Sequence, residues 1–172
     1  MSTVRVDPPL SGDETATLMG YLDYHRDTLR MKVDGLDAAQ LQATLAPSTM
    51  TLGGMVKHLA FVEHWWTRCV FEGLEYAEPW ASVDWDADWD WDWHSAAGAE
   101  LDELSALLDR ETTASDEVVR RAADLDRLSQ RTGREGVPFS LRWILVHLVE
   151  EYARHNGHAD LLREAIDGQT GE

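Results

Sequence analysis

The feature that most restricts the fold is a spacing of apolar residues three and four apart, repeated over four long stretches. These stretches cover about residues 13–35, 51–71, 97–123 and 140–166. Such spacing puts apolar side chains on one side of a helix. The third stretch would tolerate a break near residues 112–115, and no stretch reads clearly as a strand. We therefore predict an all-α chain folded as a four-helix bundle.

A length of 172 residues predicts a single domain, residues 1–172. Residues 1–12 contain Pro8, Pro9 and Gly12 and are expected to form an extended lead-in before the first helix. A short helical turn is predicted over residues 37–41. Residues 129–138 contain two glycines and a proline, and they are predicted to be a loop.

Residues 80–94 read WASVDWDADWDWDWH, in which tryptophan and aspartate alternate. Alternation is typical of a strand, but aspartate is a poor strand former and no partner strand is evident. We predict a long surface crossover loop between the second and third helices, with its indoles packed down and its carboxylates in water. The indoles would either fix the loop to the bundle or cover a pocket and bind an apolar substrate.

Composition excludes several classes of protein. With 32 acidic and 15 basic side chains the formal net charge is −17, which repels phosphate backbones and argues against nucleic acid as a partner. The single cysteine, Cys69, cannot form an internal disulfide and is expected to be a buried structural thiol, as fits a reducing cytoplasm. We see neither a signal pattern nor an apolar run that could span a bilayer, and predict a cytoplasmic protein with no membrane partner.

The fourth helical stretch carries a carboxylate and an imidazole near its apolar face. Glu151 and His155 are four residues apart, so both side chains point the same way, with roughly 6 Å between their Cβ atoms. An unpaired buried carboxylate is costly, so either a cationic side chain or a metal ion should compensate it. His58, on the shoulder of the second stripe, offers a third ligand. His58, Glu151 and His155 would suit zinc, and also nickel, iron or manganese, with an open coordination position.

Other histidines accompany this candidate ligand set. His147, His158 and His25 are candidates to support the ligands or to line a pocket. The alternatives are that His147 lies at the bundle rim, that His158 is exposed and that His25 is a core histidine. His64 falls on nearly the opposite face from His58 and is predicted to be solvated.

Two segments resemble a known family. LRWILVHLVEEYARHNGHADLLREAIDG (residues 141–168) is similar to the last helix of the DinB-like superfamily, and TLGGMVKHLAFVEHWW (residues 51–66) is similar to its second helix. The nearest branch is the one that includes mycothiol-dependent maleylpyruvate isomerase, through its N-terminal domain, and the mycothiol S-transferases. The resemblance implies a helical bundle that holds a metal ion through His58, Glu151 and His155.

The resemblance favours one function over two others. The leading hypothesis is a metal-dependent S-transferase that conjugates a small cellular thiol, with mycothiol as co-substrate, to electrophiles through a metal-bound thiolate. Its partners would be a small thiol and a small electrophile, and the ion would be divalent, zinc first. One alternative is a metal-dependent hydrolase that activates water. The other is a non-enzymatic metal-binding stress-response module, and a homodimer is considered in each case.

Overall fold

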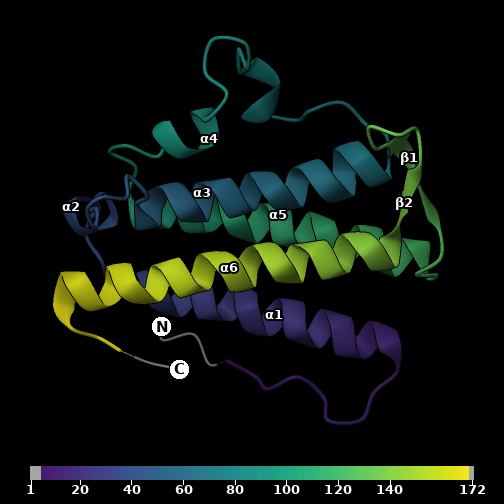
Figure 1. Ribbon diagram of the computed structural model, residues 1–172, viewed down its shortest axis with the longest axis horizontal. Helices are drawn as coiled ribbons and strands as arrows, with labels where there is room; N and C mark the ends of the chain where they lie inside the picture. The colour runs from purple at the N-terminus through teal and green to yellow at the C-terminus, as the bar shows by residue number, and fades with distance from the viewer. Residues whose placement is uncertain (1–4, 171–172) are drawn as a thin grey trace.

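The computed structural model describes residues 5–170 and is mostly helical (Figure 1), which confirms that part of the prediction. The helices are α1 (Glu14–Val33), α2 (Ala38–Leu41), α3 (Leu52–Glu63), the π-helical η1 (His64–Phe71), the 3₁₀ turn η2 (Trp80–Ser82), α4 (Trp91–His94), α5 (Leu101–Ala122) and α6 (Leu141–Asp167). The strands are β1 (Leu128–Thr132) and β2 (Pro138–Ser140). Residues 5–12 of the expected lead-in contain neither helix nor strand, and residues 1–4 lie outside the described part.

The long helices run side by side. Helix α1 packs against α6, α3 packs against α5, and α3 also contacts α6 (Figure 1). Each supplies apolar side chains that are completely or almost completely buried; examples are Leu29, Leu59, Leu108 and Leu148. Within residues 5–170, no helix is both long enough and apolar enough to cross a membrane.

The ends of α1 and α6 follow from local chemistry. Asp13 accepts a hydrogen bond from the Ala16 backbone N–H at 2.8 Å, and Ser140 accepts one from Trp143 at 3.2 Å. These side chains satisfy amide groups that the first helical turn leaves unpaired. Helix α6 ends at Gly168, whose φ of +76° is readily adopted by glycine.

The third long helix corrects the prediction in two ways. Helix α5 begins at Leu101 rather than near residue 97, and it runs without a break through residues 112–115. Thr112 does not break the helix because its hydroxyl donates to the Asp109 carbonyl at 3.2 Å, three residues earlier. A polar residue therefore need not interrupt a helix when its side chain forms a hydrogen bond within that helix.

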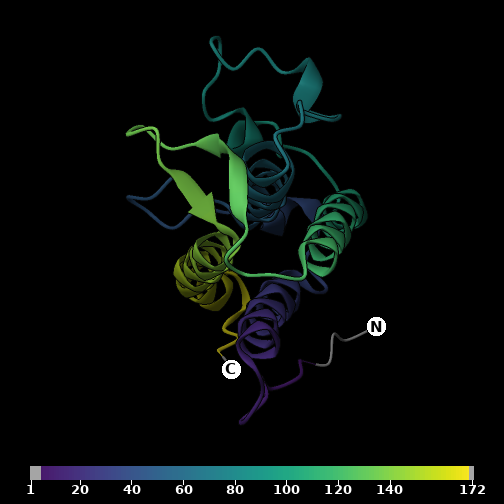
Figure 2. The same ribbon diagram turned by 90° about the vertical axis from the view of Figure 1, so that its right-hand side faces the viewer.

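Residues 129–138, predicted as a loop, belong instead to an antiparallel hairpin of β1 and β2. The hairpin projects from the helices (Figure 2). Ser129 stabilises it by donating to the Arg131 carbonyl at 2.6 Å and accepting from the Phe139 N–H at 2.9 Å. The strands have five and three residues, too short and polar to produce a clear alternating pattern.

The tryptophan–aspartate segment is more ordered than a loop, because it includes η2 and α4. Trp80 is completely buried, as expected of an indole that packs down. Trp89 is 81% exposed and Asp92 only 4% exposed, so the predicted division between packed indoles and wet carboxylates is wrong at these two residues.

A buried ion pair links α1 to α3. Arg26 and Glu63 are 2% and 0% exposed, and the guanidinium donates two hydrogen bonds to the carboxylate, at 2.7 and 3.0 Å. The exposed carboxylate of Asp23 also accepts from Arg26, at 2.8 Å. Two parallel hydrogen bonds fix the relative position of the paired groups.

Candidate metal centre

His58 on α3 and Glu151 and His155 on α6 come together between the two helices. One ligand atom of each lies within 4.8 Å of the others. The imidazole rings of His58 and His155 have centroids 5.0 Å apart, and Glu151 Oε2 is 3.6 Å from His155 Nε2. His155 is buried and the other two are partly buried. Side chains from two helices that are far apart in sequence thus face a common point.

Asp92 positions His58. Its Oδ2 lies 2.6 Å from His58 Nδ1, and the carboxylate is buried. With Nδ1–H donating to this carboxylate, the lone pair of Nε2 is left free for a metal ion. A carboxylate behind an imidazole is the usual second layer of a histidine metal site. Sequence reasoning missed Asp92, because the alternating segment did not indicate which of its aspartates would turn inward.

Trp93 covers the two imidazoles. Its ring stacks on that of His58 at 4.6 Å between centroids, with 24° between planes, and its centroid is 5.5 Å from that of His155. The indole can approach α3 closely because residue 54 is glycine. A Cβ built there would lie 2.9 Å from Trp93 Cε3.

The donors suit a divalent cation of intermediate softness. The pKa of Glu151 is lowered, first by its interaction with His155 and then by the charges of His147, His155 and His58, against the opposing effect of burial. Glu151 is therefore a carboxylate at neutral pH. His155 Nδ1 is buried and has no hydrogen-bond partner among residues 5–170. No described group of the protein therefore satisfies this nitrogen. Two imidazoles and a carboxylate fit zinc and its neighbours.

The three supporting histidines differ in position. His147 Nε2 is 3.4 Å from Glu151 Oε1, so this ring lies directly beside the cluster. His158 has its ring centroid 5.7 Å from that of His155. His25 instead contacts Asn156, whose amide donates to the His25 carbonyl at 2.9 Å, and burial lowers the pKa of its imidazole.

His64 is buried, so the prediction that it is solvated is wrong. It is 2% exposed, its Nδ1 lies 2.9 Å from Glu111 Oε2 on α5, and its Nε2 accepts from the Ala77 N–H at 3.2 Å. The cause is that α3 and η1 are covered on two sides. Helix α6 packs near His58 and helix α5 packs on the opposite face, which a single apolar stripe does not indicate.

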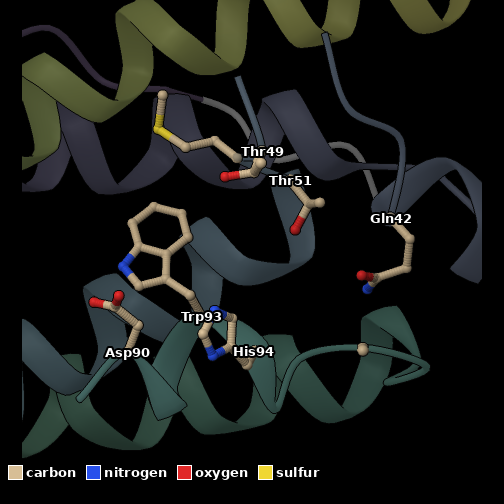
Figure 3. Close-up of a pocket in the computed structure, with 8 residues that line it drawn as sticks. Gln42, Thr49, Thr51, Asp90, Trp93 and His94 are labelled. Atoms are coloured by element: carbon tan, nitrogen blue, oxygen red, sulfur yellow. The ribbon is translucent and has the colours of Figure 1, made fainter. Parts of the chain in front are cut away.

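A pocket of about 450 Å³ has Trp93 in its lining, and the same indole stacks on His58. Figure 3 shows Trp93 and Asp90 close together and Thr51 and Gln42 lying apart from them. The lining combines an indole with hydroxyl, amide and carboxylate groups. Trp93 is therefore a shared wall between this polar pocket and the candidate metal centre.

Comparisons with known proteins agree with the resemblance noted above. A crystal structure of a conserved protein from Enterococcus faecalis shares the fold, with a TM-score of 0.64, 16% sequence identity, and coverage of 92% of this chain and 100% of that one. No curated protein matches the sequence. The family model described as mycothiol-S-transferase matches residues 17–168. The chain therefore belongs to the mycothiol S-transferase family, a branch of the DinB-like superfamily.

Proposed function

We propose that this protein is a metal-dependent S-transferase that joins a small thiol, mycothiol or a close analogue, to an electrophile. The observation that carries the proposal is the convergence of His58, Glu151 and His155, with Asp92 holding the first of them. Membership of the mycothiol S-transferase family is the reason for naming mycothiol as the thiol. The ion expected is zinc.

The three side chains would hold the ion through His58 Nε2, a Glu151 oxygen and a His155 nitrogen. A divalent cation bound there would favour the thiolate form of a thiol that coordinates it. Asp92 would keep the His58 ring in one tautomer, and Trp93 packs against both imidazoles. Three protein ligands leave coordination positions for a substrate.

Thioether formation needs no reagent besides the thiol and the electrophile. With an alkyl or aryl halide, the sulfur forms a bond to carbon and the halide leaves with the electron pair of the broken bond. The proton of the thiol passes to solvent. With an activated double bond, the sulfur adds to one carbon and a proton is taken up at the other.

The polar pocket beside Trp93 would take the polar part of the thiol. Gln42, Thr51 and Asp90 offer both donors and acceptors, and the indole offers a flat apolar face. This combination suits a ligand rich in hydroxyl groups, whose C–H bonds can lie on the ring while its hydroxyls bind the rim.

The test compares purified wild-type protein with Glu151→Gln and Glu164→Gln. Glu164 is the matched control, because it is an exposed glutamate of the same helix and belongs to neither candidate ligand group. Elemental analysis should find close to one ion per chain in the wild type and in Glu164→Gln, and much less in Glu151→Gln. Metal-loaded protein with mycothiol and monochlorobimane should form the thioether faster than the metal-free protein.

Two results would overturn the proposal. One is thioether formation at the uncatalysed rate with the ion bound. The other is turnover of an ester or amide, in the absence of any thiol, that is lost in Glu151→Gln, because this would indicate a hydrolase.

A further inference from the structure

Four aromatic rings form a continuous surface where the hairpin meets α6. They are Trp66 of η1, Phe139 of β2, and Trp143 and His147 of α6, here called the aromatic wall. Trp143 lies 4.7 Å from Phe139 and 5.0 Å from His147 between ring centroids, the latter pair stacked at 21°. Trp66 contacts all three others, at 4.7 to 5.2 Å. Such distances are typical of favourable ring pairs.

The aromatic wall ends at the candidate metal centre. His147 Nε2 is 3.4 Å from Glu151 Oε1, while the other oxygen of the same carboxylate faces His155 at 3.6 Å. Glu151 thus has the aromatic wall on one side and the imidazole ligand on the other. A molecule that extends along the wall to its His147 end would reach the donors that hold the ion.

The aromatic wall is open to solvent at its outer end. Trp143 is 44% exposed, and the hairpin side chains Leu128 and Val137 are 53% and 61% exposed. These residues and Phe139 line a pocket of about 520 Å³. Clustered exposed apolar side chains mark a binding surface more often than isolated ones do.

We propose that the aromatic wall binds the electrophile, and that the preferred electrophiles are planar aromatic compounds. The inference rests on the proposed function and adds the substrate class to it. The pocket beside Trp93 is lined by polar and apolar groups alike, whereas the aromatic wall offers only ring faces and edges. Since Trp93 contacts His58 and His155 while His147 contacts Glu151, the thiol and the electrophile would reach the ion from different sides.

The experiment measures equilibrium binding of 1,3-dinitrobenzene, which has the flat ring of an aryl electrophile but no halide to lose. Wild-type protein is compared with Trp143→Ala, Trp143→Phe and Trp89→Ala by NMR titration without any thiol. Trp89 is the control because it is 81% exposed and lies in the tryptophan–aspartate segment. Loss of one ring contact should raise the Kd roughly two- to tenfold in Trp143→Ala. Trp143→Phe and Trp89→Ala should bind nearly as wild type.

A kinetic arm separates this inference from the proposed function. In Trp143→Ala the KM for 1-chloro-2,4-dinitrobenzene should rise by the same factor as the Kd, while the KM for the small aliphatic iodoacetamide and the metal content stay unchanged. If adducts form but both KM values are unaffected, the S-transferase assignment stands and the role of the aromatic wall fails. If no adduct forms with either compound while the Kd still depends on Trp143, the transferase fails and the aromatic-binding surface stands.

A subunit interface is the competing explanation for exposed apolar side chains. Sedimentation of wild-type protein and Trp143→Ala tests it. A dimer that Trp143→Ala converts to monomer, with 1,3-dinitrobenzene bound only by the monomer, would overturn the inference, because a second copy would then cover the aromatic wall.

Discussion

Asp92 Oδ2 lies 2.6 Å from His58 Nδ1, so a carboxylate of the tryptophan–aspartate segment holds an imidazole of α3. The contact is largely shielded from solvent, because the side chain of Asp92 is only 5% exposed and that of His58 only 20%. It fixes which nitrogen of His58 carries the proton. The segment therefore contributes to the candidate metal centre without providing one of the three donors.

Replacing Asp92 should weaken metal binding. Asp92→Asn removes the negative charge behind His58 and disturbs its orientation, and changes of this kind typically lower metal affinity about 10- to 100-fold. Competition of each protein with a chromophoric chelator for zinc measures the affinity. The control is Asp86→Asn, which removes an equally charged but exposed side chain of the same segment. Equal zinc affinity in both variants would contradict the role given to Asp92.

Replacing Glu63 should destabilise the fold strongly. Glu63→Gln leaves the Arg26 guanidinium buried without its main counter-charge, which typically costs about 3–5 kcal/mol of unfolding free energy. Asp23→Asn removes an exposed partner of the same guanidinium and should cost at most about 1 kcal/mol. Urea denaturation measures both. A double replacement, Arg26→Met with Glu63→Leu, should recover part of the loss.

Stability should depend on pH through Glu111. Burial alone would raise the pKa of Glu111, but hydrogen bonds and charges from His64 and Arg110 outweigh it, and the net pKa is lowered. A lowered pKa stabilises the fold above the ordinary value, about 4.3, and this contribution is lost as the pH falls through the folded-state value. Unfolding free energies of the wild type should therefore fall more steeply below about pH 4.5 than those of Glu111→Gln. Glu117→Gln, at an exposed position, should follow the wild type.

Cys69 should be unreactive in the folded protein. It is buried as predicted, and burial raises the pKa of its thiol to about 11. Relative to the ordinary value of 9, the thiolate fraction at neutral pH is about 100-fold smaller. Ellman's reagent should label the native chain very slowly and label one thiol per chain in denaturant, with Cys69→Ser as the blank. Labelling of the native chain as fast as free cysteine would exclude this burial.

The sequence predicts best what local chemistry determines. Helix α1 begins after Asp13 and α6 ends at Gly168, because capping depends on neighbouring residues. Glu151 and His155 share a direction because they lie one helical turn apart. The apolar stripe of the second helix offered His58 as a candidate, but its position beside them depends on the packing of α3 on α6, which the family resemblance implied.

The buried polar residues that the sequence did not reveal depend on contacts between residues distant in sequence. The burial of His64 requires Glu111, 47 residues away, and that of Asp92 requires His58, 34 residues away. In the hairpin, which also has backbone pairing between its strands, Ser129 bonds to Arg131 in its own strand and to Phe139 in the other. The residues of each of the two histidine–carboxylate pairs are too far apart in sequence to share one helical stretch. The periodicity of apolar residues therefore could not reveal the pairs.

The glycine at position 54 has a consequence beyond the backbone of α3. Trp93 packs 2.9 Å from the position that a methyl group would take, and Asp92 precedes Trp93 directly in the chain. A side chain at position 54 would crowd Trp93, and any shift of α4 in response would move Asp92 relative to His58. The metal affinity of the site would then depend on the absence of a side chain at position 54 of α3 as well as on the identity of the ligands.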